Sequence, residues 1–349
     1  MKNIAIFINE LSMGGIQKSC INMIKNLDKK KYNIDLYIFK NDNFFNADLN
    51  VNIITLKKPT YLIKFIPFDI AYKLYNPELP DKEYDISIDF DTYQMHTTIA
   101  SLKVKAKKYV TWIHNDIKIK LKEEVKYKIL HFFFQKKYVH FDSFCAVSKG
   151  ALEGFLEVHP LKDKECRVIP NYIDTSEIKE KMKKKVDLKV DKKKVNIVTV
   201  GRLTHQKGID IMLHNIQELL KYRKDFHLYI IGDGEEKEKL LKLRKDLELE
   251  DYVTFLGSTN NPFQYLNIMD LFYLSSRYEG QGMVILEALA VGIDVLIPKH
   301  LEKYCDNVEG QDDVVEYLKK YKRTKENKFD PLTDYNHHIT KELQKLFEK

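Results

Sequence analysis

At positions 278–292 the chain reads Tyr278-Glu279-Gly280-Gln281-Gly282-Met283-Val284-Ile285-Leu286-Glu287-Ala288-Leu289-Ala290-Val291-Gly292. Apolar runs flank this stretch at 271–274 and at 295–298. The stretch therefore reads as the end of a strand, a turn that contains glycines, one helix and the next strand.

Two glutamates bracket the turn and the helix. Glu279 lies in the loop and Glu287 in the helix, so both carboxylates can face one ligand. A helix that begins near Gly282, Met283 and Val284 also offers unpaired N–H groups, which suit an anion such as a diphosphate. Taken alone, Glu287 is better interpreted as a solvated helix residue, and only the rest of the chain favours a ligand role.

Length and charge narrow the class of protein. The chain has 349 residues, of which 44% are hydrophobic, so it can form two globular domains and is not disordered. Up to Tyr172 it has 27 basic and 20 acidic residues, and after Tyr172 it has 31 of each. The net charge of +7 is thus confined to the first half, which indicates an anionic surface or a polyanion as partner.

Targeting signals and cysteine spacing indicate a cytoplasmic protein. No apolar signal region follows Met1, and nowhere do 18 apolar residues run together, so we expect no membrane span. The cysteines form no C-x-x-C pair, which predicts reduced thiols in the core and no zinc site; they are Cys20, Cys145, Cys166 and Cys305.

Short apolar strands alternate with helical patterns along the whole chain. This rhythm predicts an α/β protein with two doubly wound, Rossmann-like domains that face a central cleft. Composition places an N-terminal domain at 1–173, a Lys-rich linker at 174–194, a C-terminal domain at 195–330, and at 331–349 a helix that crosses back to the first domain.

In such sheets ligands collect beyond the carboxyl ends of the strands. Several candidate residues directly follow a predicted strand: Gly14, Gly15, His114, Gly201, Arg202, Asp233 and Glu279. The Gly14-Gly15 pair permits close approach of a phosphate or a sugar. It lacks the third glycine of a dinucleotide fingerprint, which disfavours a nicotinamide or flavin site, and a simple turn is the alternative.

Arg202 and Lys207 lie five residues apart on a loop between a strand and a helix. A planar guanidinium and an ammonium can together neutralise a leaving diphosphate without a metal. The alternative is two exposed loop cations.

Three further features of the first half have two readings each. Asp89 and Asp91 share a strand face but have no further acidic ligand nearby, so we interpret them as structural residues and not as a metal site. His114 is either a hydrogen-bond partner for a sugar hydroxyl or a structural histidine. The segment Lys118 to Tyr138 mixes lysines with apolar and aromatic residues, which is typical of a membrane-surface helix and equally of a solvated helix over a core.

With these residues in place, the chain resembles the large family of retaining nucleotide-sugar glycosyltransferases with the GT-B fold, which build capsules, cell-wall polymers and glycolipids. The resemblance covers most of the chain. It rests on 278–292 and on five other segments: 14–17, 147–148, 168–174, 200–208 and 231–234. The chain departs from the family pattern at Tyr172, where glycine is usual, and at 299–304, which replaces a glycine-rich segment.

The resemblance implies a role for each matching residue. Arg202 and Lys207 would hold the donor diphosphate, Glu287 the ribose and Glu279 the donor sugar, whereas Gly15 and His114 would approach the donor from the first domain. The wider donor-binding set would also include Gly14, Gly201, Gly282, Met283 and Val284. The catalytic set would be Glu279, His114, Arg202 and Lys207, with no metal or other cofactor.

The sequence therefore predicts a retaining glycosyltransferase of the cell envelope. It would move a sugar from a nucleotide diphosphate donor, a UDP-sugar by preference, to a hydroxyl of a lipid-linked or growing glycan. It would be cytoplasmic or peripheral on the inner face of the membrane, where the Lys118 to Tyr138 region would meet anionic lipid, and it would bind no nucleic acid. The alternatives are a GT-B UDP-sugar epimerase and a non-catalytic, membrane-associated relative.

Overall fold

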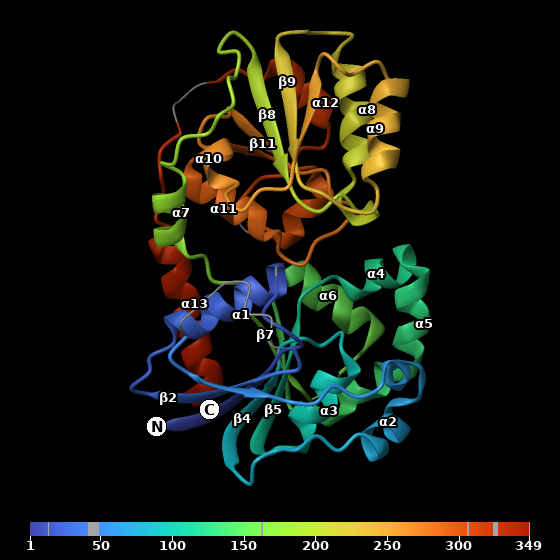
Figure 1. Ribbon diagram of the computed structural model, residues 1–349, viewed down its shortest axis with the longest axis vertical. Coiled ribbons are helices and arrows are strands. Elements are labelled where there is room, and N and C mark those ends of the chain that lie inside the picture. Colours follow the sequence, from blue (N-terminus) through green and yellow to red (C-terminus); the bar gives the residue numbers. More distant parts are fainter. Residues whose placement is uncertain (13, 41–48, 162, 306, 324–326, 349) are drawn as a thin grey trace. The chain divides into compact units, whose positions relative to one another are not determined.

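The computed structural model describes residues 1–349 except 13, 41–48, 162, 306, 324–326 and 349 (Figure 1). The chain forms two compact units. Unit 1 comprises Met1–Tyr172 together with Asp334–Lys349, and unit 2 comprises Ile173–Thr333. Each unit has its own sheet, in which every pair of neighbouring strands is parallel.

The sheet of unit 1 has seven strands in the order β3-β2-β1-β4-β5-β6-β7. Their bounds are β1 Lys2–Phe7, β2 Tyr32–Ile38, β3 Asn52–Thr55, β4 Glu83–Asp89, β5 Lys105–Ile113, β6 Ser143–Ala146 and β7 Glu165–Val168. The strands are built from runs of β-branched and aromatic residues, and their buried side chains form the main core of this unit.

The helices of unit 1 connect its strands and cover its sheet (Figure 1). They are α1 Gly15–Asn26, η1 Tyr61–Phe65, α2 Phe68–Leu74, α3 Met95–Lys103, α4 Ile117–Glu123, α5 Val125–Phe134, η2 Gln135–His140, α6 Lys149–Val158 and α13 Thr333–Glu348. The last helix, α13, belongs to this unit although it comes from the far end of the chain. It buries one apolar face in the core of the unit, through Ile339, Leu343, Leu346 and Phe347.

Unit 2 repeats the pattern with five strands in the order β10-β9-β8-β11-β12. The strands are β8 Val195–Val200, β9 Phe226–Ile231, β10 Val253–Gly257, β11 Leu271–Tyr273 and β12 Asp294–Leu296. The helices are α7 Thr175–Lys181, η3 His205–Lys207, α8 Ile209–Leu219, α9 Lys237–Asp246, α10 Phe263–Leu266, α11 Met283–Val291, η4 Lys299–Tyr304 and α12 Val314–Lys320. The two parallel sheets with alternating helices confirm the predicted α/β class.

The lysine-rich segment 174–194 is part of unit 2 and not a free linker. It begins with α7, which buries Ile178 and, just after the helix, Met182. Side-chain amides of unit 2 bind the end of α7. Asn261 Nδ2 donates to the Lys181 carbonyl at 3.0 Å, and Asn267 Nδ2 donates to the Met182 carbonyl at 3.2 Å. The few apolar residues among the lysines are therefore enough to dock the segment.

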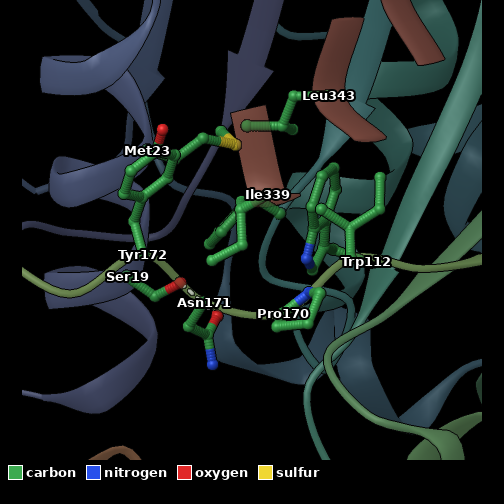
Figure 2. Close-up of a pocket in the computed structure, with 10 residues that line it drawn as sticks. Ser19, Met23, Trp112, Pro170, Asn171, Tyr172, Ile339 and Leu343 are labelled. Atoms are coloured by element: carbon green, nitrogen blue, oxygen red, sulfur yellow. Dashed lines mark hydrogen bonds between the residues drawn. The ribbon is translucent and has the colours of Figure 1, made fainter. Parts of the chain in front are cut away.

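The end of unit 1, at Asn171 and Tyr172, is held by α1 and α13. Asn22 Nδ2 donates to the Tyr172 carbonyl at 3.0 Å, and the Tyr335 hydroxyl donates to the Asn171 carbonyl at 3.0 Å. Ser19 donates to the Asn171 side chain, so the turn is bonded from both helices. The cavity beside it has a volume of about 10 Å³, roughly the space that one water molecule needs. Figure 2 shows residues that line it.

No helix formed by the described residues is both long enough and apolar enough to cross a membrane.

Candidate functional site

The predicted donor residues of unit 2 lie on two loops at one edge of its sheet. The loop 201–208 follows β8, and the loop 274–282 follows β11. Because β8 and β11 are parallel neighbours, their carboxyl ends lie side by side. The structure thus brings together Gly201, Arg202, Lys207, Glu279 and Gly282.

Backbone and amide hydrogen bonds join the two loops. The Arg277 N–H donates to the Gln206 carbonyl at 2.8 Å, and Gln206 Nε2 donates to the Tyr278 carbonyl at 3.1 Å. Gly208 has φ +60°, and a Cβ there would lie 2.3 Å from the Ser275 carbonyl oxygen, so a residue other than glycine would push the loops apart. The loop that carries Lys207 is therefore positioned before any ligand arrives.

Lys207 and Glu279 form an ion pair at the centre of this edge. Lys207 Nζ lies 2.6 Å from Glu279 Oε1, and the Ser276 hydroxyl donates to the same oxygen at 2.6 Å. The Glu279 side chain is only 6% exposed and that of Lys207 18%. Partial burial strengthens the attraction between the two charges, so the pair fixes the position of the ammonium.

A second ion pair, between Arg277 and Asp210, also joins the two loop regions. Arg277 binds Asp210 with both guanidinium NH groups, at 2.8 and 2.7 Å, and its NH1 also donates to the His205 carbonyl at 2.8 Å. The Arg277 guanidinium holds the pKa of the Asp210 carboxyl below its ordinary value. Arg202, by contrast, is exposed, so its guanidinium is accessible to a ligand.

Helix α11 begins at this edge, as the sequence predicts. Gly282 is its N-cap with φ +65°, which leaves the backbone N–H groups at the start of the helix, around Met283 and Val284, without helical acceptors. Glu287 lies one turn further along and is buried, at 9% exposure. It is therefore not a solvated helix residue.

In unit 1, the predicted residues also follow strand ends. Gly14 is the N-cap of α1 and Gly15 its first residue, and a Cβ on Gly15 would meet open space. His114 follows β5 and is buried, with its Nε2–H donating to the Phe90 carbonyl at 2.8 Å. Burial lowers the pKa of His114 to about 4, so near neutral pH the ring is uncharged and its Nδ1 is a hydrogen-bond acceptor.

For the Lys118 to Tyr138 segment the structure agrees with the second reading, a helix over a core, but divides the segment into three helical elements. The segment consists of α4, α5 and η2, and it contributes Tyr127, Phe134 and Tyr138 to the core. Lys137 is fully buried. Its ammonium donates to the Thr92 carbonyl and, at 3.2 Å, to the Thr98 hydroxyl, and it interacts with Asp89 and Asp91.

The described residues contain no group of three histidines, cysteines or acidic residues that could hold a metal ion. The four cysteines are free thiols, three of them buried. The predicted site residues of unit 2 supply cations, carboxylates and helix N–H groups, a set that recognises an anion next to hydroxyl groups.

Comparison with known proteins agrees with this chemistry. Residues 13–177 match the family model described as Glycosyltransferase Family 4, and residues 179–325 match the model described as Glycosyl transferases group 1. An uncharacterised glycosyltransferase of Haemophilus influenzae is 28% identical over 298 residues, which are 85% of this chain and 80% of that protein. A Campylobacter jejuni protein is 26% identical over 86% of this chain and 81% of its own length. It is named N-acetylgalactosamine-N,N'-diacetylbacillosaminyl-diphospho-undecaprenol 4-alpha-N-acetylgalactosaminyltransferase.

Solved structures share the fold over the whole chain. Anabaena HepE in complex with UDP and glucose superposes with a TM-score of 0.68 at 16% identity and covers 100% of both chains. The lipopolysaccharide outer core galactosyltransferase WaaB covers 99% of this chain and 91% of its own, with a TM-score of 0.57 at 18% identity. Fold and site together define a glycosyltransferase of the GT-B class. Within that class the chain belongs to the glycosyltransferases of family 4.

Proposed function

We propose that this glycosyltransferase moves a sugar from a UDP-sugar to a hydroxyl of a lipid-linked or growing glycan, with retention of the anomeric configuration and without a metal. The Lys207–Glu279 ion pair carries the proposal, since it places a fixed cation beside a buried carboxylate at the start of α11. The names of the two most informative relatives support it: HepE is bound to UDP, and the Campylobacter protein acts on a diphospho-undecaprenol substrate.

Each charged group of the site has one task in this mechanism. Arg202, Lys207 and the N–H groups at Gly282 to Val284 stabilise the negative charge that develops on the leaving diphosphate. Glu287 binds the ribose hydroxyls and Glu279 the donor sugar. The acceptor oxygen bonds to the anomeric carbon on the face from which UDP departs. The electron pair of the broken bond and the proton of the hydroxyl both go to the diphosphate oxygen.

The test is a transfer assay in the presence of EDTA. UDP-hexoses and UDP-N-acetylhexosamines are offered with diphospholipid-linked hexose and N-acetylhexosamine acceptors, and UDP release and product are followed by mass spectrometry. We expect transfer that depends on the acceptor and persists in EDTA. Release of an epimer without acceptor would identify an epimerase instead, and failure to bind any nucleotide sugar would favour a non-catalytic protein.

We also propose that unit 1 docks on an anionic membrane. Among the described residues, thirteen large hydrophobic side chains are exposed, and nine of them lie on η1, α2, α5 and η2. These four elements adjoin, since η1 packs on α5 and α2 on η2. We call the nine the apolar surface: Tyr61, Leu62, Phe65, Ile70, Leu74, Val125, Ile129, Phe132 and Val139.

Exposed lysines lie on α2, α4, α5 and η2, close in sequence to the residues of the apolar surface. They are Lys73, Lys122, Lys126, Lys128 and Lys136. Acidic residues offset part of this charge: Asp69 lies 3.5 Å from Lys136, and Glu123 and Glu124 lie between Lys122 and Val125. Apolar side chains that enter the headgroup region, together with lysines worth about 1 kcal/mol each near anionic lipid, favour a bilayer over a folded protein partner.

Vesicle sedimentation tests the docking. At low salt we expect the protein to sediment with phosphatidylglycerol vesicles, to be released by 0.5 M NaCl, which is roughly the salt that screens charges beyond about 4 Å, and not to sediment with phosphatidylcholine. The double substitution Leu62→Glu and Phe132→Glu is expected to lower the bound fraction about tenfold. Tyr222→Glu, at an exposed aromatic residue of unit 2, is the control and should bind like the wild type. Equal binding of all three proteins would reject the surface.

A further inference from the structure

The core of unit 1 contains two buried carboxyl groups near one buried lysine. Lys137 is fully buried, and two carboxylates interact with its ammonium, those of Asp89 and Asp91. A buried ammonium is balanced by one carboxylate, and a second one carries the cost of desolvation without a cation of its own. One of the two aspartates therefore lacks a cation of its own.

Asp89 is the structural member of the pair. It is the last residue of β4 and completely inaccessible. Its Oδ2 accepts a hydrogen bond from the Thr98 hydroxyl, which also receives one from Lys137. The Thr98 hydroxyl thus links Asp89 of β4 to Lys137 of η2 by two hydrogen bonds.

Asp91 is placed differently. It lies two residues further on, beyond the end of β4, and is 6% exposed where Asp89 is 0% exposed. The backbone N–H of Asn9, which follows β1, bonds to its carboxylate. Burial, followed by the charge of Asp89, raises the pKa of Asp91 to about 7. Carboxyl groups with a strongly raised pKa are common at functional sites.

The neighbours of Asp91 are the predicted site residues of unit 1. Strands β1, β4 and β5 are adjacent, so the residues that follow them share one edge of the sheet. Gly14 and Gly15 follow β1, and His114 follows β5 with its ring 4.8 Å from that of Phe90.

We infer that Asp91 is the acceptor-binding residue of unit 1: its carboxylate accepts a hydrogen bond from the acceptor hydroxyl that attacks the donor sugar. This inference rests on the proposed function. The carboxylate orients the acceptor hydroxyl for attack and does not act on the donor, which the groups of unit 2 bind. The acceptor class is a sugar hydroxyl, for which a carboxylate is a strong hydrogen-bond partner.

Steady-state kinetics with the best acceptor of the transfer panel tests this role. At saturating UDP-sugar, Asp91→Asn is expected to lower kcat/KM for the acceptor about 30-fold, since the bond to a charged partner is lost. Hydrolysis of the UDP-sugar without acceptor should remain within about twofold, because the donor groups of unit 2 are intact. Asp91→Glu, which restores the charge, should recover part of the loss.

Asp89→Asn is the matched control, because it makes the same chemical change two residues earlier. We expect Asp89→Asn to lower the melting temperature, and to lower kcat/KM for the acceptor less than Asp91→Asn does. The inference is overturned if Asp91→Asn leaves kcat/KM for the acceptor unchanged, or if it lowers donor hydrolysis as much as transfer. A wild-type protein that neither transfers nor hydrolyses any UDP-sugar would instead reject the proposed function.

Discussion

Replacing Lys207 by alanine is expected to lower kcat/KM for sugar transfer by a factor of about 10² to 10³, the range measured when one preorganised group that stabilises an oxyanion is removed. Lys207 Nζ is fixed 2.6 Å from Glu279, on a loop bonded to its neighbour, so no other cation can take its place without moving the backbone. Arg202 is exposed and five residues away, and it retains part of the stabilisation.

Glu279→Ala is expected to have an effect of the same order, because it removes the sugar contact and releases the ammonium. The double variant should lose little more than either single variant, since the two side chains act as one unit. Lys221→Ala is the control: Lys221 is a 66% exposed lysine of unit 2 that forms an ion pair with Glu218. Turnover of Lys207→Ala within threefold of the control, with circular dichroism spectra unchanged, would reject the donor-site assignment.

Replacing Lys137 by methionine is expected to destabilise unit 1 by roughly 3 to 5 kcal/mol, the usual result of leaving buried charge without the opposite charge that compensates it. The substitution leaves Asp89 and Asp91 buried together without a cation. Lys136→Met changes the neighbouring lysine, which is 72% exposed and pairs with Asp69 at 3.5 Å, and should be within about 0.5 kcal/mol of the wild type.

The loss in Lys137→Met should depend on pH. Lys137 lowers the pKa values of both aspartates, so its removal raises them further above the value of 3.8 for an unfolded aspartate. A carboxyl with a raised pKa contributes stability at low pH, and that stability is lost as the pH rises through the folded-state pKa. Urea denaturation should therefore show a smaller loss at pH 5 than at pH 8. An equal loss at both pH values, or a loss no larger than that of Lys136→Met, would contradict the electrostatic interaction of Lys137 with the two aspartates.

Most of the donor-side arrangement in unit 2 could be predicted from the sequence. The reason is geometric: in a parallel sheet the residues that follow neighbouring strands meet at one edge, so locating the strands before Gly201 and Glu279 was enough to bring them together. The sequence signal of α11, a glycine turn before an apolar helix, is also local. By contrast, the partners Ser276 and Asp210 lie outside the motif pattern, and only the contacts between the loops identify them.

The first half was less predictable because its decisive contacts are long-range. Lys137 stands in a run of lysines, and nothing in its spacing distinguishes it from the exposed Lys136 beside it. Its burial follows from partners at Thr92 and Thr98, about forty residues earlier. Likewise, no predicted element or candidate site covered the segment 61–74, yet it supplies five of the nine residues of the apolar surface.

The stereochemistry of the transferred sugar tests the central claim most directly. The product formed from an α-linked UDP-sugar and the best acceptor, in EDTA, is analysed by NMR at the new anomeric centre. In the proposed mechanism the acceptor attacks from the face that UDP leaves, and Lys207, Arg202 and the start of α11 bind the UDP. This mechanism predicts an α-linked product and free UDP in equal amounts. A β-linked product, or a reaction that requires an added divalent metal, would contradict the account.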